Sequence, residues 1–135
     1  MALAAEISAY ETHEPASSQA FNRPVDLVHL SRYTLGNRSL EREVLSLFLT
    51  QSAIYLQRLK EAGADKEWID AAHTIKGSAK SIGAWQLARS AEAAETLNGG
   101  ARKSGSDQLL VELERLIGET NSYIETLLAE VSTDA

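Results

Sequence analysis

Residues 65–83 read DKEWIDAAHTIKGSAKSIG, and this stretch decides the fold. Its apolar and small residues return every three or four positions, which is the spacing of one face of an α-helix. At about 100° per residue they share a single arc. The members of this arc are Trp68, Ala72, Ile75, Ala79 and Ile82. Asp65 can cap the start of the helix and Gly83 can end or kink it. The stretch therefore predicts an amphipathic helix over about 65–82.

Similar apolar spacings flank this helix on both sides. The predicted helices span about 26–35, 39–61, 65–82, 84–97 and, from Ser104 or Ser106, the rest of the chain. The polar residues after Asn98-Gly99-Gly100 are expected to form a loop up to Gly105. Because short loops favour antiparallel neighbours, these helices predict an all-α fold, an up-down-up-down four-helix bundle with a short extra N-terminal helix.

One domain accounts for nearly the whole chain. Its 135 residues suffice for a single core, so we expect a monomer with the bundle over 24–132. Residues 14–19 are polar and contain Pro15, and the first 22 residues carry three glutamates without a long apolar run, so residues 1–23 are predicted to be a flexible leader rather than a signal peptide.

Composition excludes several function classes. Thirteen Lys and Arg against nineteen Asp and Glu give a net charge of −6, which disfavours binding to nucleic acid or to an anionic membrane. The absence of cysteine excludes disulfides, thiolate metal sites and cysteine nucleophiles, and it suits a reducing cytoplasm. No segment is long and apolar enough to span a bilayer. The chain is also too short for a kinase with its own ATP-binding domain.

Three histidines are available for chemistry. His13 and His29 have no further metal ligands at a suitable spacing, so no metal site is predicted. His73 lies outside the apolar arc of its helix and should face solvent. The residues on its own side of the helix include Lys66, Ile69, Asp70, Lys76, Gly77 and Lys80. The lysines would make a local positive patch in an acidic protein, and with Ile69 they are candidates for a docking patch.

Gly77 indicates that another molecule approaches His73. A glycine inside a helix costs about 1 kcal/mol relative to alanine, and the lack of a Cβ permits close approach. A neutral imidazole nitrogen is a good nucleophile near neutral pH, so His73 is suited to accept a phosphoryl group. Phosphoryl transfer needs mainly positioning and charge neutralisation, and Lys76 can supply a point charge three residues away.

The same residues carry a resemblance to a known family. The run His73-Thr74-Ile75-Lys76-Gly77-Ser78, with Gly83 ten residues after the histidine, resembles the motif of the histidine-containing phosphotransfer (HPt) domain. That motif is His-x-hydrophobic-Lys-Gly-Ser-x-x-x-x-Gly, and the likeness in architecture extends from about Val25 to Val131.

The resemblance implies a phosphocarrier, not an enzyme, in a two-component phosphorelay. It implies that His73 is phosphorylated on Nε2, that Lys76 stabilises the phosphoryl group and that Gly77 clears the approach of a receiver domain. The implied partners are receiver domains of hybrid histidine kinases and response regulators. No cofactor is implied on this chain, because Mg²⁺ would be carried by the receiver. Docking is expected on the His73 face and on the adjacent face of the 39–61 helix.

Two other functions stay open at this point. The bundle could be an adaptor that binds a receiver or a partner helix without chemistry. It could also be a detached phosphoacceptor fragment of a larger chemotaxis-type kinase.

Overall fold

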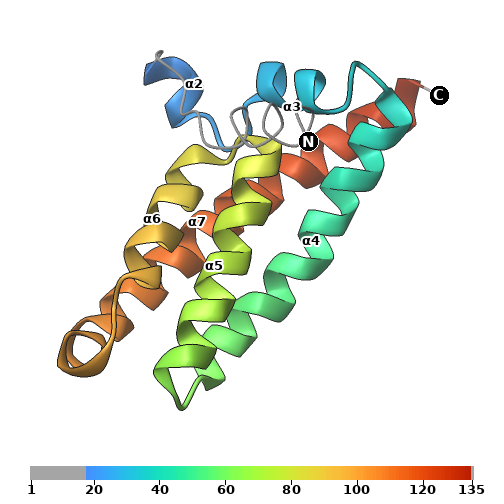
Figure 1. Cartoon of the computed structure of the whole chain (residues 1–135). Helices are drawn as coiled ribbons and strands as arrows, with labels where there is room; N and C mark the ends of the chain where they lie inside the picture. Colours follow the sequence, from blue (N-terminus) through green and yellow to red (C-terminus); the bar gives the residue numbers. More distant parts are fainter. Residues whose placement is uncertain (1–17, 135) are drawn as a thin grey trace, which may run out of the picture.

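The computed structural model describes residues 18–134, and over this range the protein is helical without any strand (Figure 1). In chain order the helices are α2 (Ser18–Asn22), α3 (Leu27–Tyr33), α4 (Arg38–Glu61), α5 (Asp65–Ile82), α6 (Trp85–Glu95) and α7 (Gly99–Asp134). The four long helices pack in a ring in which α4 contacts α5 and α7, and α6 contacts the same two neighbours. The prediction of an all-α four-helix bundle is confirmed. The short helices α2 and α3 lie across one end of it, where they contact α6 and α5 respectively.

The predicted apolar arc of α5 is the centre of the core. Trp68, Ala72, Ile75, Ala79 and Ile82 are all 2% exposed or less. Across from them α6 contributes the small buried side chains of Ala88, Ala91 and Ala94. Small residues let two helices approach closely, and α5 makes its most extensive contact with α6. The Trp68 indole Nε1–H donates to the carbonyl of Ala94 at 2.7 Å, so the indole bonds across this contact.

Gly83 forms the corner between α5 and α6. Its φ of 73° is left-handed, as glycine permits, and a Cβ there would lie 2.5 Å from the Cβ of Asp26. Asp26 donates its backbone N–H to the Gly83 carbonyl at 3.0 Å and accepts from the Trp85 indole at 3.0 Å. It also caps α3, as predicted, by accepting from the backbone N–H of His29 at 3.2 Å. Trp85 is therefore a buried part of this corner, which fixes α3 to the end of the bundle.

The predicted loop before the last helix is wrong, because α7 begins at Gly99. The reason is a set of contacts from the α4–α5 turn. The backbone N–H of Gly99 donates to the Asp65 carboxylate at 3.1 Å, and Arg102 bonds to that carboxylate at 3.0 Å and to the Ala62 carbonyl at 2.7 Å. The Gly99 N–H and the Arg102 guanidinium lower the pKa of Asp65.

The capping role predicted for Asp65 is also wrong. The residue that caps α5 is Ala64, which makes no side-chain cap bond. The Asp65 carboxylate is used by α7 instead, so it links two helices rather than ending one.

Of the expected leader, the structure describes only residues 18–23. Residues 1–17 of the expected leader lie outside the described residues. Residues 18–22 form α2, and Asn22 accepts a hydrogen bond from the Gln86 amide of α6 at 3.2 Å. Within the described range, none of the helices has the length and apolar character that crossing a membrane requires.

Candidate functional site

His73 projects from the middle of α5 into solvent. Its side chain is 66% exposed, whereas Ala72 beside it is fully buried. The apolar arc of α5 faces the core, and the helical geometry turns His73 away from it. The predicted exposure of the histidine is confirmed.

Glu95 is the partner of His73 that the sequence analysis did not find. It is the last residue of α6, and its Oε1 lies 2.6 Å from Nδ1 of His73. Its second oxygen, Oε2, lies 2.6 Å from Nζ of Lys76. One carboxylate thus bridges the histidine and the lysine. The close α5–α6 packing brings it there.

The ionisation of Glu95 decides which imidazole nitrogen is free. Burial raises the pKa of this carboxyl, but hydrogen bonds from Lys76 and His73 more than offset burial and hold the pKa below its ordinary value. An ionised carboxylate can only accept a hydrogen bond, so Nδ1 must be the donor. In a neutral imidazole the other nitrogen, Nε2, then carries the lone pair. The bridge therefore favours the tautomer that is nucleophilic at Nε2.

Lys76 lies beside the histidine, but its ammonium group already forms an ion pair. Its side chain is only 18% exposed and it is paired with Glu95. Gly77 is exposed, and a Cβ at this position would meet nothing within 4 Å. Packing inside this chain therefore does not require a glycine there, in contrast to Gly83.

The three residues considered for a docking patch differ in their surroundings. Lys66 forms an ion pair with Asp70 at 2.9 Å, one turn along the same helix. Ile69 is half-buried and packs against the core, and Lys80 is half-buried. The positive charge near His73 is therefore smaller than the lysine count suggests.

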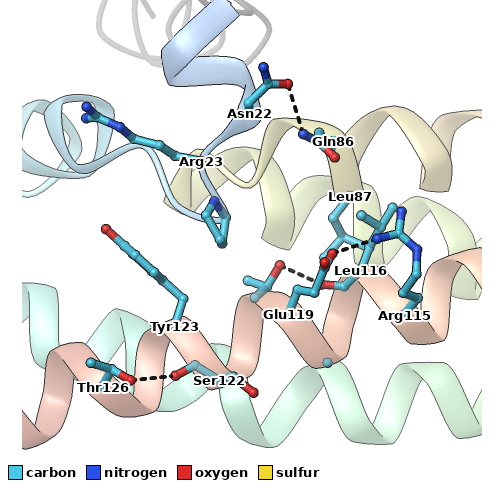
Figure 2. Close-up of a pocket in the computed structure, with 13 residues that line it drawn as sticks. Asn22, Arg23, Gln86, Leu87, Arg115, Leu116, Glu119, Ser122, Tyr123 and Thr126 are labelled. Carbon is cyan, nitrogen blue, oxygen red and sulfur yellow. Dashed lines mark hydrogen bonds and ion pairs between the residues drawn. The ribbon is translucent and has the colours of Figure 1, made fainter.

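A groove of about 740 Å³ lies elsewhere on the molecule (Figure 2). It is lined by residues 22–24, by the first turn of α6 and by α7, and α5 contributes nothing to it. Arg115 in its wall is paired with Glu119 at 2.9 Å. No group of three or more histidine, cysteine, aspartate or glutamate side chains within 18–134 could hold a metal ion. The candidate site for phosphoryl transfer within the described residues is therefore the cluster of His73, Lys76 and Glu95.

Comparison with known proteins identifies the family. The model described as the Hpt domain matches residues 43–133, which is more than half of the chain. The protein belongs to the Hpt domain family. Neither a curated protein nor a solved structure matches it. The Hpt match contains the whole of α5 and α6, and hence all three members of the cluster.

Membership of this family settles the general role. An Hpt domain takes part in histidine phosphotransfer within a phosphorelay, and it interacts with receiver domains. It carries the phosphoryl group and is not a kinase. This protein is therefore a phosphocarrier in signal transduction, and the HPt resemblance of its motif is confirmed.

Proposed function

We propose that the protein relays a phosphoryl group between aspartates of two receiver domains through Nε2 of His73. The partners would be receivers of hybrid histidine kinases and of response regulators. The observation that carries the proposal is the hydrogen bond from Nδ1 of His73 to Glu95 at 2.6 Å, on a side chain that is 66% exposed. This hydrogen bond leaves the lone pair on Nε2, and the exposure of the ring makes Nε2 accessible to a phosphodonor.

In the forward step the lone pair of Nε2 attacks the phosphorus of a phosphoaspartate. The N–P bond forms, the bond from phosphorus to the carboxyl oxygen breaks, and its electron pair leaves with the aspartate carboxylate. Nδ1 keeps its proton, so the phosphorylated ring is a cation. The Glu95 carboxylate at 2.6 Å balances this charge.

In the second step a carboxylate oxygen of another receiver attacks the same phosphorus. The N–P bond breaks and its electron pair returns to Nε2, which leaves a neutral ring with the proton still on Nδ1. Because Nδ1 keeps its proton, the ring departs as neutral imidazole, which is a good leaving group. The phosphoryl group on Nε2 therefore transfers readily. Lys76 would turn from Glu95 toward the phosphoryl oxygens and neutralise part of their charge.

The test compares the protein with its His73→Gln variant. Both are incubated with a small phosphodonor such as phosphoramidate and with phosphorylated receiver domains, and intact masses are measured. We expect an acid-labile mass increase of one phosphoryl group in the wild type and none in the variant. Because the ring is exposed, the variant should melt as the wild type does.

Binding of receivers without any phosphoryl adduct would instead make the protein an adaptor and refute the proposal. Labelling that persists in His73→Gln would place the phosphoryl group on another residue.

A further inference from the structure

The end of the bundle that α3 covers carries a large apolar side chain in an unfavourable place. Leu35, in the turn between α3 and α4, is 93% exposed. Its φ of 56° is left-handed, and no other residue except glycine has such a value within the described residues. A residue with a Cβ adopts this conformation at an energetic cost. Neither burial nor backbone preference therefore explains a leucine at position 35.

Hydrogen bonds of the backbone hold this turn in place. The N–H of Gly36 donates to the carbonyl of Ser31 at 2.8 Å, and the N–H of Leu35 donates to the carbonyl of Arg32 at 3.3 Å. These two bonds form the Schellman motif, which ends a helix and usually has glycine at the position that Leu35 occupies. The turn thus holds the leucine side chain in solvent.

Other exposed apolar side chains lie next to Leu35 on α3. Leu27, Val28 and Tyr33 are 39%, 59% and 41% exposed. The two buried residues of this helix face the bundle. Because α3 lies across the end of the bundle, its exposed side faces away from the four long helices (Figure 1). We refer to the four apolar residues at this end as the end patch: Leu27, Val28, Tyr33 and Leu35.

Arginines surround the end patch although the protein is acidic. The stretch 23–42 contains two acidic residues and four arginines, Arg23, Arg32, Arg38 and Arg42. It therefore carries a net charge of +2, whereas the whole chain carries −6. All four arginines are exposed, and within residues 18–134 none of them lies at ion-pair distance from a carboxylate.

The two acidic residues of this stretch do not neutralise the arginines. Asp26 is buried and accepts a hydrogen bond from the Trp85 indole, and Glu41 is half-buried and accepts from the Thr34 hydroxyl at 3.2 Å. Arg38 is the first residue of α4, where the positive end of the helix dipole disfavours a cation. The positive charge at this end is therefore suited to an anionic partner.

The exposure of the end patch distinguishes between the possible anionic partners. Leu35 projects from a turn, so a protein partner would have to provide a hollow that matches it. A bilayer accepts a projecting apolar side chain anywhere on its surface. Leucine, valine and tyrosine beside arginines are also the combination that binds at the interface of anionic bilayers.

We propose that the end patch binds the surface of a bilayer that contains anionic lipids, with Val28 and Leu35 below the headgroups and the arginines at the lipid phosphates. The charge of the whole chain disfavours such binding, but the positive charge is concentrated at this end. His73 precedes Gly83 by ten residues, so it lies about 15 Å from this end along α5. Attachment through the end patch therefore leaves the imidazole accessible.

The test measures co-sedimentation of the full-length protein with vesicles of phosphatidylcholine, alone or mixed in equal parts with phosphatidylglycerol. Leu35→Asn removes the apolar side chain, and asparagine tolerates the left-handed backbone, so the turn should persist. Val111→Asn is the matched control, because Val111 is 69% exposed on α7. Arg38→Gln removes one cation, and its control is Lys103→Gln, an exposed cation near the start of α7 at the other end of the bundle.

We expect the wild type to bind the mixed vesicles and not those of phosphatidylcholine alone. Binding should weaken as salt shortens the electrostatic range from about 10 Å at 0.1 M to about 3 Å at 1 M. Leu35→Asn should bind on the order of tenfold more weakly and Arg38→Gln about fivefold more weakly. Both controls should bind as the wild type does.

Three results would overturn the proposal. Absence of binding to the mixed vesicles would point to an acidic protein surface as the partner. Equal binding to phosphatidylcholine alone would mean that the arginines contribute nothing, and equal weakening in variants and controls would mean that the end patch is not the binding surface. His73→Gln should bind vesicles as the wild type does, so the outcome does not depend on phosphoryl transfer.

Discussion

The Glu95 carboxylate sets the chemical state of two neighbouring side chains. Its Oε1 lies 2.6 Å from Nδ1 of His73 and its Oε2 lies 2.6 Å from Nζ of Lys76, so in the proposed transfer the nucleophile and the cation are positioned before a partner binds. The arrangement follows the general rule that a histidine is oriented by the group that its second nitrogen contacts. Glu95 acts through His73 and Lys76, so it is a positioning residue.

Replacing Glu95 by alanine should slow the labelling of His73 by phosphoramidate by about tenfold, because the tautomer and the charge balance of the ring are lost. Glu92→Ala, an exposed change on the same helix, is the control and should have no effect. A purely structural role for Glu95 would lower the melting temperature without changing the labelling rate of the folded protein.

The same carboxylate predicts a pH dependence of stability. The pKa of Glu95 is lowered in the folded protein from its ordinary value of 4.5, so its stabilising effect is present above that value and is lost as the pH falls through the folded pKa. Denaturant unfolding of wild type and Glu95→Gln should differ at pH 7 and converge in acid. A difference in the free energy of unfolding that grows on acidification would contradict the lowered pKa of Glu95.

At the scale of the helices, two glycines of one motif have different surroundings. Gly83 is required by packing, because Asp26 occupies the space of its missing side chain. Gly77 has open space around it and no such requirement. The first glycine shapes the bundle, and we propose that the second gives a receiver domain access to His73.

Gly83→Ala should therefore destabilise the protein by about 2 kcal/mol or more, from the left-handed backbone and the overlap with Asp26. Chemical denaturation measures this loss. An unchanged free energy of unfolding in Gly83→Ala would mean that the corner rearranges freely and does not fix α3.

Gly77 substitutions should separate stability from transfer. Gly77→Ala should stabilise the helix by up to about 1 kcal/mol. Gly77→Leu should slow transfer from a receiver by steric block while a small donor still labels His73. Receiver transfer at the wild-type rate in Gly77→Leu would show that a receiver does not need the space at Gly77 to reach His73.

At the scale of the whole molecule, long-range contacts bring together parts that sequence spacing alone does not relate. Arg102 joins the start of α7 to the α4–α5 turn and lies 5.4 Å from the Trp68 ring centre. Arg102→Ala should lower the melting temperature by about 4 °C or more and speed amide exchange over residues 99–105. Lys103→Ala, an exposed neighbour, is the control, and equal effects of both would show that the Arg102 contacts do not hold the start of α7.

The sequence predicts what is local and misses what depends on contact between helices. The arc of α5, the exposure of His73 and the cap at Asp26 follow from spacing within one helix. Glu95 lies 22 residues from His73, and only the register of α6 against α5 brings it to the ring. The early start of α7 is likewise set by Asp65, far away in the chain.

The most direct test of the proposed role of His73 is nitrogen NMR of the phosphorylated protein with labelled histidine. We predict one phosphoryl group, bound to Nε2 of His73, with the proton on Nδ1. Phosphorylation on Nδ1, or on a residue other than His73, would contradict it.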